Sequence, residues 1–232
     1  MAKDKPVIPS GLSIESFVLL KLIAEKSNVL FIYEKDYNRI SKLIQALNIK
    51  ATILNDDLDE LERARSFGFD VIHGNLNTGI LKDYSKTKFD YIVCENHLHS
   101  ARYPLDVLNE MVDACENLIL SNNNQAHWRK RLKFFFRGSF FVDNQYDIIP
   151  DDEYAWYNNY PWKLTHKDIV NLCVCSNLTI HKGIIIYNDS IIDNMYDIRS
   201  YPNWSAKKVY YLISNSSTTA KISYQFGGRT FG

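Results

Sequence analysis

The chain has 232 residues, of which 46% are hydrophobic and 23% charged, and 27 basic side chains balance 27 acidic ones. This is enough for one large domain with a substantial core. The zero net charge excludes a whole-protein basic field for nucleic acid or membranes. No apolar run approaches the roughly 20 residues that span a bilayer, and no secretory signal is visible, so we expect a soluble, cytoplasmic protein.

The first part of the chain alternates helices and strands. A capped amphipathic helix is predicted over 13–26. The predicted buried strands cover 28–33, 50–55, 69–75, 89–96 and 116–122. The predicted helices between them cover 36–47, 56–68 and 104–115. This alternation predicts β-α-β units in a mostly parallel sheet, whose ligands bind outside the carboxyl ends of the strands.

The pattern changes after residue 123. A basic-aromatic helix is predicted first, then a Tyr- and Trp-rich loop over 146–162, a short helix over 165–175, and strands near 178–187 and 207–214. We expect three parts: an N-terminal helix over 1–27 packed on the domain, the domain itself over 28–214, and a polar tail or edge hairpin over 215–232. The four cysteines match no zinc spacing, so reduced, buried thiols are expected. They are Cys94, Cys115, Cys173 and Cys175.

Three segments between 69 and 138 form an ordered set of motifs: FDVIHGNLNTGI, KFDYIVCEN and NNNQAHWRKRL. They resemble the MetW (methionine biosynthesis protein W) family of class I methyltransferase-like proteins. The Trp156–Tyr157 pair and the segment Asp168–Cys173 extend the resemblance. It implies an α/β, Rossmann-like class I methyltransferase fold with a mostly parallel seven-stranded sheet and a final antiparallel strand. It also implies a role in methionine biosynthesis at the homoserine acylation step, with a homoserine acyltransferase as partner.

The loop that would bind the cofactor departs from this family. Such domains carry a motif like L-D-L-G-C-G-D-G after the first strand, where glycines permit positive φ and a close approach to S-adenosylmethionine. Here the three glycine positions hold Tyr33, Lys35 and Tyr37, with Asp36 between them. Three side chains are therefore expected where the methionine part of the ligand would lie.

The other cofactor positions are also altered. Asn55, with Asp56 beyond it, stands where an acidic residue usually binds the ribose, and Asn75 stands where an Asp faces the adenine. An amide can still hydrogen-bond an amine. The degenerate pocket is predicted to comprise Tyr33, Asp36, Asn55, Asn75 and Glu95.

These departures favour a pseudoenzyme that has lost S-adenosylmethionine, needs no cofactor, and acts through a protein partner. The alternatives are a different ligand in a reshaped loop, or an active methyltransferase on a small molecule that binds S-adenosylmethionine and S-adenosylhomocysteine. A third alternative is a structural subunit of a larger assembly. Whether the chain is an enzyme is left open, with the balance toward no catalytic activity.

Three further groups invite a functional interpretation. Glu95 is followed by His97 and His99, which in a strand end would share one side and suit a general base or a metal. We favour polar rim residues, and predict no catalytic residue and no metal site.

The basic-aromatic helix contains His127, Trp128, Arg129 and Arg131, which match the family pattern. We favour helix packing or a protein interface over RNA binding. Trp156 and Tyr157 in the aromatic loop are assigned either to a partner or substrate surface or to covering the sheet edge.

Overall fold

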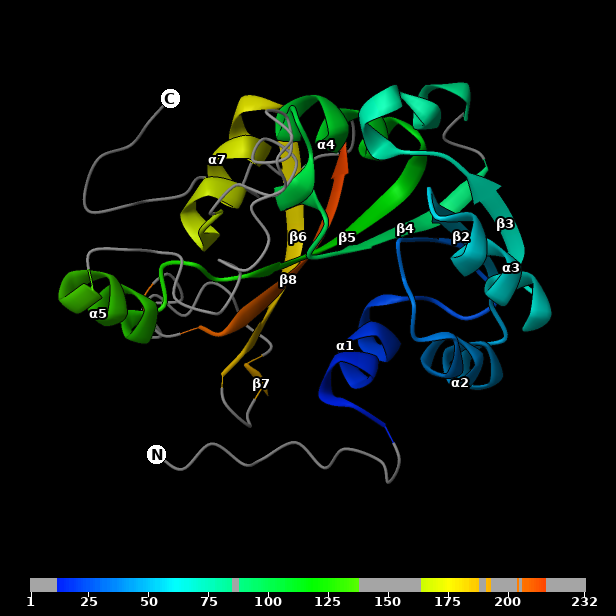
Figure 1. Cartoon of the computed structure of the whole chain (residues 1–232), viewed down its shortest axis with the longest axis horizontal. Coiled ribbons are helices and arrows are strands. Elements are labelled where there is room, and N and C mark those ends of the chain that lie inside the picture. Colours follow the sequence, from blue (N-terminus) through cyan, green and yellow to red (C-terminus); the bar gives the residue numbers. More distant parts are fainter. Residues whose placement is uncertain are drawn as a thin grey trace, which may run out of the picture.

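The computed structural model describes residues 12–84, 88–137, 164–187, 191–192, 204 and 206–215. Within these ranges the chain forms a central sheet with helices on both faces (Figure 1). The strands are β1 (Asn28–Ile32), β2 (Lys50–Asn55), β3 (Asp70–His73), β4 (Phe89–Glu95), β5 (Cys115–Asn123), β6 (Leu178–Ile186), β7 (Ile191–Ile192) and β8 (Lys208–Asn215). The α-helices are α1 (Ile14–Leu22), α2 (Tyr37–Leu47), α3 (Leu58–Ser66), α4 (Pro104–Asp113), α5 (Trp128–Arg137) and α7 (His166–Cys175). The 3-10 helices are η1 (Leu76–Thr78), η2 (Ile80–Asp83) and η3 (Leu98–Ser100).

The described strands lie in the order β3-β2-β1-β4-β5-β8-β6-β7. Strands β1 to β5 pair in parallel, and β8 lies antiparallel between β5 and β6. The seven strands from β3 to β6 confirm the predicted Rossmann-like methyltransferase sheet with a final antiparallel strand. The two-residue strand β7 adds an antiparallel edge beside β6 that the sequence pattern did not predict.

Both faces of the sheet are buried, which explains the continuous apolar runs of the central strands. Along β1, Leu30 and Ile32 pack into the core that includes α4 and α7, whereas Val29 and Phe31 pack into the core that includes α1 and α2. Figure 1 shows the same division, with α1, α2 and α3 on one side of the sheet and α4 and α7 on the other.

Side-chain caps mark the start of several helices. Ser13 caps α1 as predicted, and Asp57 caps α3. Helix α1 ends at Leu22, earlier than predicted, because Ile23 is already extended. The basic-aromatic helix begins only at Trp128, since β5 continues to Asn123 and a turn follows.

Several sequence predictions fall partly or wholly outside the described residues, namely the aromatic loop over 146–162 and all but the first residue of the segment 215–232. Of the four cysteines, three are buried as predicted. The prediction is wrong for Cys175, which is exposed because it lies on the outer side of α7 at the end of the helix. None of the helices in the described part of the chain has the length and apolar character of a membrane span.

Candidate functional site

The predicted pocket residues lie in one row at the carboxyl edge of the parallel strands. They end or follow β1, β2, β3 and β4, and they are Tyr33, Asp36, Asn55, Asn75 and Glu95. Parallel pairing places the ends of β3, β2, β1 and β4 side by side in that order. This is the edge at which open α/β sheets bind ligands.

Tyr33 lies across this row. Its backbone φ is 53°, in the left-handed region that favours glycine, at the first position where the family carries one. Its hydroxyl accepts a hydrogen bond from the Leu76 N–H at 3.1 Å, and its ring meets the His97 ring at 5.2 Å between centroids. One side chain therefore links the loop after β3 to the loop after β4. Burial raises the pKa of Tyr33 to about 12 although the Leu76 N–H lowers it, so the phenol is neutral near pH 7.

The loop between β1 and α2 is closed by its own carboxylates. Glu34 Oε1 accepts hydrogen bonds from the backbone N–H groups of Lys35 and Asp36, at 3.0 and 2.9 Å. Asp36 Oδ1 caps α2 by accepting from the Arg39 N–H at 3.0 Å. Backbone N–H groups before a helix ordinarily offer a site for an anionic ligand. Here side-chain carboxylates of the chain occupy three such groups.

The third glycine position is buried in the core. Tyr37 is 2% exposed, and its hydroxyl lies 2.9 Å from the Glu60 carbonyl oxygen, to which it donates. Its ring packs against Phe67 and Phe69. The side chain thus fastens the start of α2 to α3 and to the residue before β3.

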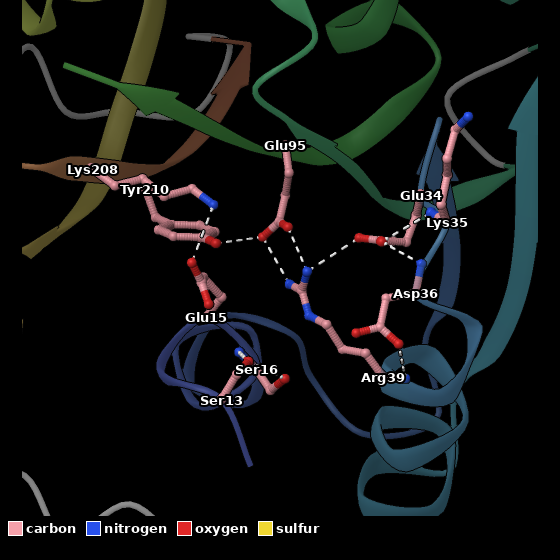
Figure 2. A network of polar contacts seen from close by, with 10 residues as sticks. All are labelled: Ser13, Glu15, Ser16, Glu34, Lys35, Asp36, Arg39, Glu95, Lys208 and Tyr210. Atoms are coloured by element: carbon pink, nitrogen blue, oxygen red, sulfur yellow. Dashed lines mark hydrogen bonds and ion pairs between the residues drawn. The ribbon is translucent and has the colours of Figure 1, made fainter. Parts of the chain in front are cut away.

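Glu95 belongs to a polar network on the α1 and α2 side of the sheet (Figure 2). Its two oxygens accept hydrogen bonds from Arg39 Nη1 and Nη2 at 2.7 and 2.9 Å. Oε1 also accepts from the Tyr210 hydroxyl at 2.5 Å, and Glu34 Oε2 lies 3.1 Å from Arg39 Nη1. The Arg39, Glu95 and Glu34 side chains are only 13%, 11% and 16% exposed. Both oxygens of Glu95 are therefore engaged within the protein.

Arg39 stabilises the two carboxylates of this network to different degrees. Burial tends to raise the pKa of Glu95, but the hydrogen bonds and charge of Arg39 outweigh burial and hold that pKa below its usual value. For Glu34, burial raises the pKa, and the charge of Arg39 offsets this only partly. Arg39 is thus bound mainly to Glu95, and Glu34 is the weaker of its two partners.

The two amide positions also make hydrogen bonds within the protein. Asn55 is 2% exposed and its Oδ1 accepts from the Asp57 N–H at 3.0 Å, while its buried Nδ2 has no hydrogen-bond partner among the described residues. Asn75 Nδ2 donates to Asp56 Oδ2 at 2.7 Å, and its Oδ1 accepts from the Asn77 N–H at 2.8 Å. Asn75 therefore caps η1 and ties it to the residue after β2.

The histidines after β4 do not share a strand face as predicted. Strand β4 ends at Glu95, Asn96 turns the chain with a φ of 59°, and His99 lies within η3. Burial, followed by the neighbouring His99, lowers the pKa of His97 to about 4. Nowhere in the described ranges do three His, Cys, Asp or Glu side chains come together as a metal site.

The predicted partner residues lie at the start of α5. The His127 and Trp128 rings stack at 5.9 Å, and the Arg129 guanidinium lies 5.3 Å from the Trp128 ring. Arg131 Nε donates to the Ala126 carbonyl at 2.6 Å. Trp156 and Tyr157 are outside the described residues. Helix α5 follows β5, the strand next to β4 in the parallel part of the sheet.

Two central residues of the site were not predicted from the sequence. Arg39 is one of two charged residues on the amphipathic helix α2, and Tyr210 is one of 15 tyrosines. Tyr210 joins Glu95 from 115 residues away. The only local signal was that Arg39 lies in the first turn of α2, close after the acidic residues Glu34 and Asp36.

Several solved structures with a similar fold are described as methyltransferases. The chain is similar to an S-adenosylmethionine-dependent methyltransferase of Thermotoga maritima, described as a possible histamine N-methyltransferase, with 13% identity and a TM-score of 0.59 over 87% of this chain and 88% of that one. A methyltransferase of Methanosarcina mazei has 12% identity and a TM-score of 0.58, with 85% and 96% covered. A chain from the complex of the Haloferax volcanii Trm112 methyltransferase activator with a methyltransferase has 12% identity and a TM-score of 0.57, with 86% and 88% covered.

At these identities the structural likeness establishes the fold alone. A search of curated protein sequences found no significant match. The family model for the methionine biosynthesis protein MetW matches residues 15–213, from α1 to β8. The resemblance noted in the motifs is confirmed over most of the chain. The protein therefore belongs to the MetW family.

Proposed function

We propose that this MetW family member is a methyltransferase-fold protein that does not bind S-adenosylmethionine and acts through a protein partner. The observation that carries the proposal is the loop after β1, where Glu34 accepts hydrogen bonds from two backbone N–H groups of the loop. An internal carboxylate therefore occupies N–H groups of the loop that, by the family resemblance, would receive the amino-acid part of the cofactor.

The neighbouring residues support the same conclusion. The Tyr33 ring lies across the edge and its hydroxyl takes the Leu76 N–H, and Glu95 is already neutralised by Arg39. A ligand would have to displace these contacts and leave the Glu34 and Glu95 carboxylates without their donors. Uncompensated buried polar groups cost about 1 to 3 kcal/mol each, more when charged. The residues present therefore do not fit the cofactor.

Without a cofactor, the retained fold needs another use. Family membership suggests methionine biosynthesis, and we place the protein at the homoserine acylation step, as a binding partner of a homoserine acyltransferase. One of the structurally similar proteins was solved in complex with an activator protein, which illustrates that this fold also works in assemblies.

The cofactor part is tested by isothermal titration calorimetry of the purified chain with S-adenosylmethionine and with S-adenosylhomocysteine. We expect no saturable heat up to about 1 mM ligand, which corresponds to binding weaker than about −4 kcal/mol. A dissociation constant in the micromolar range would contradict the proposal and favour an active methyltransferase.

The partner part is tested by mixing the chain with the homoserine acyltransferase encoded in the same genome. We expect a complex of defined stoichiometry in size-exclusion chromatography with light scattering. Separate elution of the two proteins at about 10 μM each would contradict this part alone.

A further inference from the structure

Helix α5 exposes an unusual row of apolar side chains. Trp128, Leu132, Phe135 and Phe136 are 39%, 47%, 78% and 74% exposed. Their spacing of i, i+4, i+7 and i+8 places them on one side of the helix. We call these four residues the apolar stripe of α5. Figure 1 shows α5 at the margin of the molecule, away from the helices that cover the sheet.

The start of the helix is anchored to the body of the protein. The Ala126 N–H donates to Asn124 Oδ1 at 3.1 Å, and Asn124 Nδ2 donates to the Ala206 carbonyl at 3.0 Å. Arg131 bonds the Ala126 carbonyl and lies over the Trp204 ring at 5.3 Å. These contacts hold the first turns of α5 to the segment that leads into β8. The stripe is thus presented in a fixed orientation, which lowers the entropic cost of binding.

The surroundings of the stripe in the sequence are cationic. Arg129 and Lys130 are exposed, and the segment 124–137 contains no Asp or Glu. The whole chain has zero net charge, so this basic character is local. A complementary surface therefore combines an apolar floor with carboxylates at its border.

We propose that the apolar stripe of α5 docks into an apolar groove of a partner protein, and that the border of this groove carries acidic side chains. Anchors at i, i+4 and i+7 are the pattern by which a helix binds in a groove. Aromatic and Arg side chains at the centre are typical of residues that dominate protein interfaces. The Phe135 and Phe136 rings meet at 5.3 Å in a T-shaped pair, a compact projection suited to a pocket. An anionic membrane is less favoured because the neutral chain supplies no long-range attraction.

This inference rests on the proposed function, because it assigns the contact surface for the partner named there. The experiment measures binding of the full chain to the homoserine acyltransferase encoded in the same genome, by calorimetry at two salt concentrations. The test variants are Phe135→Ser/Phe136→Ser and Arg129→Glu/Lys130→Glu. The control is Val174→Ser, which removes an exposed apolar side chain from α7 (62% exposed). Circular dichroism and thermal unfolding check that each variant is folded.

We expect the double Phe variant to weaken binding at least tenfold, and the Val174 control to leave binding unchanged. The charge-reversal variant should weaken binding and reduce its dependence on salt, since electrostatic attraction across the border is screened by ions. Unchanged binding by the folded double Phe variant overturns the docking surface and leaves the partner proposal standing. No binding by the unaltered chain overturns both.

Two further measurements test whether the apolar stripe instead binds a membrane or a second copy of the chain. The unaltered chain is mixed with vesicles of phosphatidylglycerol and with vesicles of phosphatidylcholine, and its self-association is followed by sedimentation. Binding to the anionic vesicles, or self-association, that disappears in the double Phe variant assigns the stripe to a membrane or to a second copy. Either result overturns the proposal of a protein groove.

Discussion

The loop after β1 and helix α5 differ in how far their interacting groups are used within the protein. In the loop, Glu34 and Asp36 accept hydrogen bonds from backbone N–H groups. The Tyr33 hydroxyl accepts a hydrogen bond from the Leu76 N–H in the loop after β3. In α5, by contrast, Phe135 and Phe136 remain 78% and 74% exposed. The region that binds ligands in this fold is closed by its own side chains, and a region elsewhere on the surface is open.

This contrast indicates where binding resides in the molecule. Polar groups that are paired internally give a ligand little to gain, because it must first replace existing hydrogen bonds. Exposed aromatic side chains have most of their apolar surface still to bury. We infer that the protein uses the methyltransferase fold as a scaffold and binds through α5.

The largest effect is expected from removing the cation beneath the closed loop. Arg39→Met leaves the Glu34 and Glu95 carboxylates buried without their guanidinium, and breaking a buried ion pair costs about 3 to 5 kcal/mol. Urea unfolding at pH 7 measures this loss. Lys50→Met is the control, because the Lys50–Asp70 pair is exposed and such pairs contribute about 0 to 1 kcal/mol. Equal, small losses in the two variants would show that the network does not hold the loop.

A smaller effect concerns pH and His97, which packs against Tyr33. The pKa of His97 is lowered to about 4 in the folded chain, so the unfolded chain binds the proton more readily. His97 therefore contributes stability that is present above the unfolded pKa near 6.5 and is lost as the pH falls toward 4. Its share of the loss between pH 7.5 and pH 5 is about 1 to 2 kcal/mol. Urea unfolding of His97→Gln and of the exposed control His73→Gln at both pH values measures this share. The loss of unfolding free energy should be smaller in His97→Gln than in the control, and an equal loss in both would refute the prediction.

A third prediction concerns only the Tyr33 hydroxyl, which binds the loop after β3 at the carboxyl edge of the sheet. Tyr33→Phe leaves the Leu76 N–H without its acceptor while keeping the ring against His97, which should cost about 0.5 to 1.5 kcal/mol. Amide hydrogen exchange of the variant should show faster exchange at Leu76 than in the unaltered chain. If the Leu76 amide exchanges at the same rate in both, the hydroxyl does not close this edge.

The smallest effect on stability is expected from replacing the exposed rings of α5. Phe135→Ser/Phe136→Ser should change the free energy of unfolding by no more than about 0.5 kcal/mol, as is usual for exposed positions. A loss above about 2 kcal/mol in urea unfolding would mean that these rings pack against the protein and are not available to a partner.

Much of the fold was readable from the sequence because its determinants are local. The apolar runs of β1 and β2 and the capped start of the helix at Ser13 each predicted their element. The end of α1 and the start of α5 were placed less well, since capping and turns depend on single residues. Strand β7 has two residues and no pattern of its own.

The site was predicted only in part for a different reason. The replaced glycines marked Tyr33, Lys35 and Tyr37 as blocking positions, but not what their side chains contact. The expectation is wrong for Tyr37, whose ring packs in the core against Phe67 and Phe69, and the exposed Lys35 side chain points toward Glu60. The Tyr33 hydroxyl reaches Leu76 over 43 residues and Tyr210 reaches Glu95 over 115. Contacts of this range follow from strand order, which the spacing of motifs does not specify.

Hydrogen exchange of the full chain with two additives, measured by mass spectrometry, is the most direct test of whether the protein binds through α5 and not at the sheet edge. We predict that the homoserine acyltransferase slows exchange in α5, at 128–137, and that 1 mM S-adenosylmethionine slows it nowhere in 33–37 or 75–77. Protection of the edge loops by S-adenosylmethionine, with α5 unchanged by the acyltransferase, would contradict the central claim.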